Sequence, residues 1–277
     1  MKVIEHADAA SLWSVAESFL ACDPANNTHQ LSAVKRILDL GAHDGQRFFS
    51  VGANDELLGS AVRVDTKTLF LSVMADDAVT VLADHLREQN VELAGVLGRR
   101  GTLSAFTPAY GRDYEVHVEL LLYQLYGKPV FGGASGASRV ATLNDLELLI
   151  EWHRAFEKEV HMINVPTPLE ERVARRVRDE QLVLWTDDNE PVSFAGGNGL
   201  PAASARIGPV YTPPSLRGRG FAQAATAAAS VHVQRDQPRT VFLFTDASNP
   251  ASNVCYQRIG YRHIADHAHL LFDQTAP

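Results

Sequence analysis

Cysteine is scarce in this chain of 277 residues: only Cys22 and Cys255 are present, one in each half. This count excludes a disulfide framework and a cysteine-based zinc site, and it is typical of the reducing cytoplasm. Long apolar runs are missing too, because none approaches the roughly 20 residues that a membrane helix needs. The first residues, Met1 to His6, lead into no apolar segment of the signal-peptide kind. We therefore expect a cytoplasmic protein with no membrane partner and no bound metal.

Positive charge is also in deficit, with a formal net charge of −8 at pH 7 and an isoelectric point of about 5.7. Nucleic acid is not an expected partner of such a surface. An acidic surface is compatible with a cationic partner such as an amine, although charge by itself is weak evidence. The remaining composition is that of a globular protein, without long polar tracts.

The C-terminal half alternates strands with helices, which predicts an α/β fold with a mixed sheet. The expected strands are 138–142, 181–186, 191–195, 203–212, 240–245, 261–264 and 269–272. The expected helices are 144–156, capped by Asn144, and then 169–177, 218–234 and 250–258. Turns are expected at 187–190 and at Gly196-Gly197-Asn198-Gly199.

The N-terminal half repeats this rhythm with weaker signals. Its expected strands are 3–4, 47–51, 57–62, 69–73, 92–97 and 116–126, and its expected helices are 12–20, 31–38 and 76–88. The run from Gly132 to Ala137 has the composition of a linker. We therefore expect domains at 1–130 and 138–277, joined by a linker at 131–137. The matching order of elements indicates an internal duplication, although no residue-level repeat is visible.

One segment, from Arg206 to Ala222, combines the features of an anion site. An apolar strand ends at Pro213-Pro214, and a glycine-rich loop then opens directly into a helix. Gly218 and Gly220 let the backbone approach a ligand, and the first amides of the helix point outward without intrahelical partners. A P-loop needs Lys-Ser/Thr where Phe221-Ala222 stands, and a dinucleotide fingerprint needs a third glycine. A tight structural turn explains the same glycines, so the loop alone does not establish a function.

The residues around this loop resemble a known family. Arg217-Gly218-Arg219-Gly220-Phe221-Ala222 is similar to the acetyl-CoA signature of the GNAT superfamily, Arg/Gln-x-x-Gly-x-Gly/Ala. The preceding residues, Val210 to Pro213, look like that family's fourth strand. The segment from Asn249 to Tyr261 resembles its Asn…Tyr…Gly-Phe/Tyr segment. The resemblance implies tandem GNAT-like domains, each a mostly antiparallel twisted sheet flanked by helices. The central strands would splay in the C-terminal copy, and the N-terminal copy would be degenerate.

The resemblance also implies roles for individual residues. The pyrophosphate of acetyl-CoA would rest on the amides of the loop: Arg217, Gly218, Arg219, Gly220, Phe221 and Ala222. The pantetheine arm would run along Val210, Tyr211 and Thr212, with Pro209 marking the start of the splay and an amide near Val210 polarising the acetyl carbonyl. Asn249 would cap the next helix and Asn253 would hold the arm.

Tyr256 is the candidate general acid, which would protonate the thiolate that leaves. Without the resemblance, a core tyrosine packed against Ile259 and Tyr261 would be the simpler interpretation. The candidate general bases are Glu157, Glu159 and His161, of which we choose Glu159, although a solvated charged helix end over core aromatics is the simpler interpretation.

Other sequence features leave less room for chemistry. The expected fourth strand carries Ser204 and Arg206 where the family commonly has a carboxylate, so a water relay remains an alternative for deprotonating the amine. Cys255 reads as a buried cysteine. His263, His267 and His269 lack the carboxylate or thiol frame of a metal site.

The N-terminal half contains no counterpart of the loop. Where one is expected the sequence reads Met74-Ala75-Asp76-Asp77, and two carboxylates at a helix start would repel a pyrophosphate. We expect this half to complete the fold, to shape the acceptor cleft or to mediate a homodimer.

The resulting hypothesis is an N-acetyltransferase. It would use acetyl-CoA as co-substrate, without a metal, and would acetylate a primary amine of a small molecule or peptide by direct attack in a ternary complex. The rival is a non-catalytic acyl-CoA-binding or sensor module. The sequence leaves the acceptor open.

Overall fold

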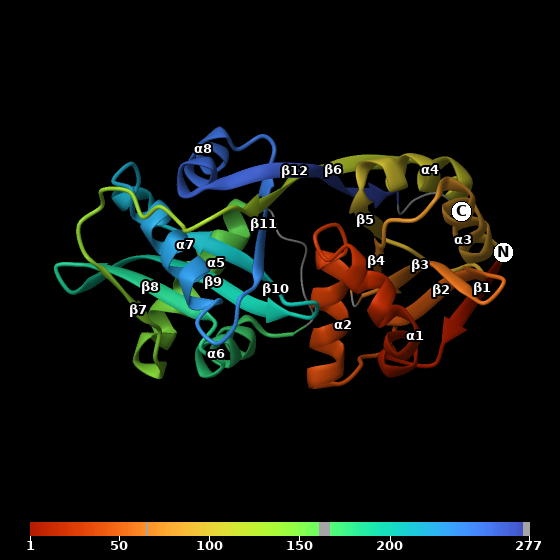
Figure 1. Ribbon diagram of the computed structural model, residues 1–277, viewed down its shortest axis with the longest axis horizontal. Helices are drawn as coiled ribbons and strands as arrows, with labels where there is room; N and C mark the ends of the chain where they lie inside the picture. The colour runs from red at the N-terminus through yellow and green to blue at the C-terminus, as the bar shows by residue number, and fades with distance from the viewer. Residues whose placement is uncertain (65, 161–166, 274–277) are drawn as a thin grey trace.

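The computed structural model describes residues 1–64, 66–160 and 167–273. Among these residues, twelve strands form one mixed sheet in the order β1-β2-β3-β4-β5-β12-β6-β11-β10-β9-β8-β7. Helices pack on both faces of this sheet, and the two halves of the chain lie side by side (Figure 1). Within the described ranges, no helix combines the length and the apolar character needed to cross a membrane.

The N-terminal half contributes six strands and four helices from the described residues. Their bounds are β1 (Lys2–His6), α1 (Ala9–Cys22), α2 (Thr28–Leu40), β2 (Arg47–Ala53), β3 (Glu56–Arg63), β4 (Thr68–Leu71), α3 (Asp76–Glu88), β5 (Gly95–Arg99), α4 (Arg100–Tyr110) and β6 (Tyr114–Leu125). The sequence failed to predict α4, a helix that contains Gly101 and an internal Pro108. Its buried face, which includes Leu103 and Phe106, packs into the core of this half, so tertiary burial outweighs weak local propensity.

The C-terminal half repeats this order. Its elements are β7 (Ala137–Val140), a 3₁₀ turn (Leu143–Asp145), α5 (Leu146–Glu159), α6 (Leu169–Arg178), β8 (Leu182–Asp187), β9 (Glu190–Leu200), β10 (Ser204–Tyr211), a 3₁₀ turn (Pro214–Leu216), α7 (Phe221–His232), β11 (Thr240–Asp246), α8 (Pro250–Ile259) and β12 (Tyr261–Phe272). The strands expected at 261–264 and 269–272 are one continuous strand. The cap expected at Asn144 is instead a reciprocal pair of hydrogen bonds between Thr142 and Asp145.

The last strands of the two halves are exchanged. β4 and β5 pair in parallel, as do β10 and β11. However, β6 pairs with β11 of the other half, while β12 pairs with β5. β6 and β12 then pair with each other along the centre of the sheet, and Figure 1 shows them bridging the halves. Both halves therefore contribute strands to one sheet, and the division into two domains at the linker 131–137 remains a prediction.

The turn predicted at Gly196–Gly199 is wrong, because these residues continue strand β9 to Leu200. The glycines leave room for neighbouring side chains. A Cβ on Gly196 would overlap the Arg176 guanidinium, one on Gly197 would meet Val233, and one on Gly199 would meet Arg239 at 2.9 Å. Glycine here makes space over a strand, and the chain turns only after Leu200.

Candidate functional site

The glycine-rich loop lies between β10 and α7 as the sequence predicts. Gly218 and Gly220 adopt φ angles of +79° and +84°, in the left-handed region that favours glycine. Gly220 is the N-cap residue of α7, and its carbonyl accepts the first helical hydrogen bond from Ala224 at 3.1 Å. The amides that open α7 are thus available for an anion.

The two central strands of this half part beside the loop. β10 and β11 pair in parallel from Ser204–Thr240 to Ile207–Leu243 and no further. The register of β10 on β9 shifts between Ile207 and Val210, the interval that contains Pro209. Beyond that point β11 pairs with β6 alone. The expected splay is therefore confirmed, and on the β11 side the edge of β10 at Val210 has no strand partner among the residues that the structure describes.

Both arginines of the loop are held by carboxylates. Nη2 of Arg217 lies 2.7 and 2.8 Å from the two carboxylate oxygens of Glu159, and Nε donates to the Thr212 carbonyl at 2.9 Å. Nη2 of Arg219 lies 3.0 Å from Asp187, and its guanidinium stacks over the Phe221 ring at 4.6 Å. Their charge is offset locally, so the backbone amides and the helix dipole remain the main attraction for a pyrophosphate.

Glu159, the chosen general base, is thereby linked to the loop. It stands at the exposed C-terminal end of α5 with its carboxylate engaged by Arg217. Glu157 accepts a hydrogen bond from Arg172 at 2.8 Å. His161 lies outside the described residues. Neither described glutamate offers an uncommitted carboxylate for taking a proton from an amine.

Tyr256 lies on α8, partly buried against the apolar cluster that α7 also contacts. Its ring meets that of Tyr261 edge-on, with the centroids 6.2 Å apart. Burial, with a smaller effect of Cys255, raises the pKa of the Tyr256 phenol well above its ordinary value. The phenol therefore keeps its proton at neutral pH, as a general acid must. Burial also raises the pKa of the Cys255 thiol to about 11, so this thiol is not a nucleophile at neutral pH.

The two asparagines of α8 behave differently. Asn249 caps the helix, its side chain accepting from the Ser252 amide at 3.1 Å. Asn253 donates weakly to the carbonyls of Asp246 and Ala247, each at 3.4 Å. Its Oδ1 is buried and has no hydrogen-bond partner among the described residues. An orphaned acceptor at this place fits an amide N–H of a pantetheine arm.

The linker between the halves runs beside the loop. Gln223 of α7 donates to the Val130 carbonyl at 3.3 Å, and a Cβ on Gly220 would meet that of Ala134 at 3.5 Å. Ser135 donates to Asp187, the carboxylate that also holds Arg219, and its carbonyl accepts from the Trp185 indole at 2.8 Å. The linker is thus anchored at the N-terminus of α7.

The C-terminal histidines are spread along β12. His263 pairs with Asp266 at 2.9 Å, His267 with Asn26 at 3.2 Å, and the His269 ring meets that of His117. Across residues 1–64, 66–160 and 167–273, no three His, Cys, Asp or Glu side chains form a metal-ligand set.

The sequence did not reveal a group of partly buried cationic and imidazole side chains on the opposite face of the sheet from α7. Arg206 of β10, Arg176 of α6 and His29 of α2 belong to it. In the sequence, Arg206 stands out only because it lies on the strand where the family commonly has a carboxylate. Its place between apolar Ala205 and Ile207 was the available signal, because a charged residue on a central strand requires a partner or a function.

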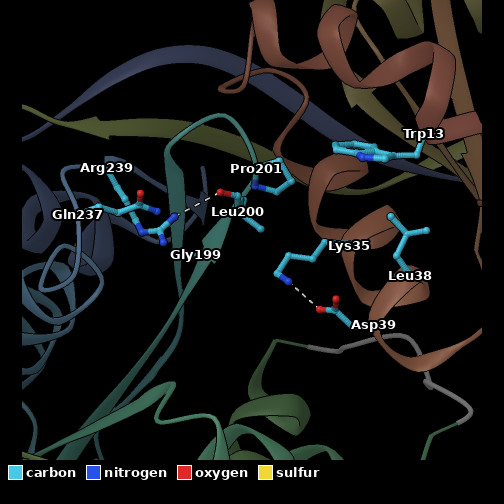
Figure 2. Close-up of a pocket in the computed structure, with 9 residues that line it drawn as sticks. All are labelled: Trp13, Lys35, Leu38, Asp39, Gly199, Leu200, Pro201, Gln237 and Arg239. Atoms are coloured by element: carbon cyan, nitrogen blue, oxygen red, sulfur yellow. Dashed lines mark hydrogen bonds and ion pairs between the residues drawn. The ribbon is translucent and has the colours of Figure 1, made fainter. Parts of the chain in front are cut away.

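A separate groove lies away from these residues. A hollow of about 390 Å³ opens between α1 and α2 on one side and the β9–β10 turn on the other (Figure 2). Lys35 and Asp39 pair on one side of it, and Arg239 donates to the Leu200 carbonyl on the other side (Figure 2). None of the predicted site residues lines this groove.

The fold of the whole chain is found in solved structures. A GCN5-related N-acetyltransferase from Sphaerobacter thermophilus superposes with a TM-score of 0.67 at 18% identity, covering 97% of this chain and 94% of that one. A GNAT-family acetyltransferase from Colwellia psychrerythraea gives 0.62 at 15% identity, covering 98% and 99%. A tandem GNAT protein from the clavulanic acid biosynthesis pathway gives 0.59 at 13%, covering 100% and 99%. The molecule therefore has a tandem GNAT fold.

The family match is confined to one half. Residues 146–261 match the model of the Acetyltransferase (GNAT) family, whereas a search of the curated proteins finds no match. The C-terminal half is thus a GNAT acetyltransferase domain, and the protein is an acyltransferase. The N-terminal half shares the fold and lacks the loop.

Proposed function

We propose that the protein transfers an acetyl group from acetyl-CoA to a primary amine by direct attack in a ternary complex. The observation that carries this proposal is the left-handed pair Gly218 and Gly220 at the start of α7, next to the point where β10 and β11 part. A pyrophosphate would bind the amides of Arg217 to Ala222. The pantetheine arm would lie along Val210, Tyr211 and Thr212, with the orphaned Oδ1 of Asn253 accepting from it.

The reaction needs one proton taken up and one released. The amine nitrogen forms a bond to the acetyl carbon, and the carbon–sulfur bond breaks. The leaving thiolate has a pKa of roughly 8.5, and the phenol of Tyr256 would donate its proton to it. The nitrogen loses a proton to water, since neither Glu157 nor Glu159 has an uncommitted carboxylate. Tyr256 then regains a proton from solvent.

Binding of acetyl-CoA and of CoA, measured by calorimetry, tests the site directly. The wild type should bind both with micromolar affinity, and Gly220→Trp should abolish binding because the indole would fill the loop. The matched control is Ala75→Trp, which alters the exposed N-cap of α3, the counterpart of Gly220 in the other half. Thermal melts of both variants separate loss of binding from loss of folding. No binding to the wild type up to about a millimolar would overturn the proposal.

A binding-competent protein should also turn over. Acetyl-CoA with a panel of amines should release CoA, detected with a thiol reagent. If acetyl-CoA binds but no amine of the panel causes CoA release, the alternative of a non-catalytic acyl-CoA-binding module is supported. The cytoplasmic location and the homodimer stay predictions of the sequence.

A further inference from the structure

Arg206 occupies a conspicuous place in the fold. It is the last residue but one of β10 to pair with β11, so its side chain leaves the sheet immediately before the strands part. Its partner in the register is Phe242, and Phe242 and Phe244 face the side of the sheet away from α7. Arg206 is half-buried there. Within the described residues it forms no ion pair and no hydrogen bond.

A second arginine reaches the same region from α6. Nη2 of Arg176 donates to the Gly208 carbonyl at 2.7 Å, at the start of the splay, and its Nε is buried without a partner among the described residues. The absence of a side chain on Gly196 gives this guanidinium its room. Burial, and next the charge of Arg206, lower the pKa of Arg176 to about 10. Both arginines therefore lie along β10, Arg206 on the strand itself and Arg176 at Gly208 two residues further on, and neither forms an ion pair with a carboxylate of the described residues.

The N-terminal half supplies the other side of this region. The ring of His29, from α2, lies tilted against that of Phe244 with centroids 4.2 Å apart, and His267 of β12 lies against the same Phe244 at 5.1 Å. Nε2 of His29 and Nδ1 of His267 are buried without partners among the described residues. Burial, followed by the charge of Arg206, lowers the pKa of His29, so its imidazole is neutral. We call Arg206, Arg176, His29 and His267 the arginine–histidine cluster.

Such a cluster is costly as mere structure. A buried polar atom without a partner loses hydration that nothing returns, and a half-buried charge without a counter-ion adds to that cost. Guanidinium groups match carboxylates in shape and charge, and neutral imidazoles supply further donors. The missing partner of this cluster is thus an anion, at the level where the acceptor would meet the thioester.

We propose that the arginine–histidine cluster binds the acceptor, and that the acceptor is an amine that also carries a carboxylate. The carboxylate pairs with Arg206, flanked by Arg176 and by His29 of the other half. The amine is then directed toward the opening between β10 and β11. The acceptor site is thereby composite, with residues from both halves. This inference rests on the proposed acetyl transfer and specifies its substrate class.

The test uses acceptors in matched pairs, namely α-amino acids and ω-amino acids against the corresponding amides. CoA release is followed with acetyl-CoA as donor. The wild type should prefer the acid of the best pair by at least about tenfold in kcat/KM. Arg206→Gln should lower kcat/KM for that acid by about tenfold to a hundredfold, the usual effect of one charged hydrogen bond, and leave the amide almost unchanged. Arg178→Gln, an exposed arginine of the same α6 helix, is the control and should keep the preference.

Acetyl-CoA binding, measured by calorimetry on the same proteins, separates the two proposals. If the wild type binds acetyl-CoA but acetylates amides as well as acids, the inference about the acceptor is overturned and the transferase stands. If the wild type does not bind acetyl-CoA, the proposed function itself fails. If no compound of the panel is acetylated, thermal melts with CoA present decide: stabilisation by the acids and not by the amides supports the cluster, and no stabilisation by any acid overturns it.

Discussion

The two halves of this molecule have the same order of elements, but they carry residues of opposite character at each position where chemistry is expected. Helix α7 begins at Gly220 with a left-handed loop, whereas α3 begins at Ala75 with Asp76 and Asp77 in its first turn. These carboxylates suit the positive end of a helix dipole and would repel a phosphate. The same position thus favours an anion in one half and is an acidic helix start in the other.

The contrast continues in the last helix of each half. Counted from its first residue, α8 carries asparagine at the fourth position and tyrosine at the seventh, Asn253 and Tyr256. At those positions α4 carries Leu103 and Phe106, both fully inside the core. The N-terminal half has apolar packing where the C-terminal half has polar groups. The two halves therefore share the architecture, which depends on burial, while these polar residues are present in the C-terminal half alone.

The halves nonetheless depend on each other, and separating them should have the largest effect of any change considered. Because β6 and β12 are exchanged, residues 1–132 alone lack β12, the strand between β5 and β6. Residues 134–277 alone lack β6, the strand between β12 and β11. Each piece should fail to fold by circular dichroism. The two pieces expressed together should associate and regain acetyl-CoA binding. A folded C-terminal piece that binds acetyl-CoA alone would contradict this dependence.

The strand exchange is also what the sequence could not predict. Hydrophobic periodicity located β8, β10, β11, α7 and α8 within a few residues, because these are strongly patterned segments. Which strand pairs with which depends on contacts between residues far apart, as between β12 and β5. The glycines of β9 illustrate the same limit. Gly196 looks like a turn residue until Arg176 is seen to occupy the space above it.

The candidate site also has a part that the sequence predicts and a part that only the fold reveals. The loop and Tyr256 were found from short motifs whose residues are close in sequence. The arginine–histidine cluster joins α2, α6, β10 and β12, so no local pattern reveals it. The pairing of Glu159 with Arg217 likewise needed the fold, since 58 positions separate them.

Changing the chemistry of α8 to that of α4 should have the next largest effect. Tyr256→Phe gives α8 the residue that α4 has and removes the phenol that donates a proton. We expect kcat to fall by about a hundredfold to ten-thousandfold, the range for a general acid, with the affinity for acetyl-CoA unchanged. Steady-state kinetics and calorimetry on the same preparation measure both. An unchanged kcat would assign Tyr256 to the core and leave protonation of the thiolate to water.

The shared sheet should be weakened by acid. Burial lowers the pKa of His267 and His269, both on the exchanged strand β12, to about 4. In the unfolded chain their ordinary value is about 6.5, so the unfolded state binds protons first as the pH falls. Their stabilisation is complete above pH 6.5 and is lost between pH 6.5 and about 4. By pH 5 the loss is about 2 kcal/mol for each histidine.

Urea unfolding at pH 7 and pH 5 measures this loss. His267→Asn should reduce the difference between the two pH values by about 2 kcal/mol. His43→Asn, at an exposed position, is the matched control. Equal free energies of unfolding at both pH values would contradict this prediction, because the histidines would then bind protons as readily in the folded protein as in the unfolded chain.

The smallest expected effect concerns the asparagine that α4 replaces with leucine. Asn253→Leu removes the buried Oδ1 that has no partner among the described residues, and gives α8 the residue found at the fourth position of α4. If that oxygen accepts from the pantetheine arm, one hydrogen bond is lost, and the Kd for acetyl-CoA should rise about threefold to tenfold. Gln257→Leu, an exposed amide of the same helix, should leave the Kd unchanged. Because a buried acceptor without a donor destabilises the protein, Asn253→Leu should also melt no lower than the wild type in the absence of ligand. Weaker binding together with undiminished stability would mark Asn253 as a residue kept for the ligand, whereas lower stability with unchanged binding would assign it to the support of the β11–α8 turn.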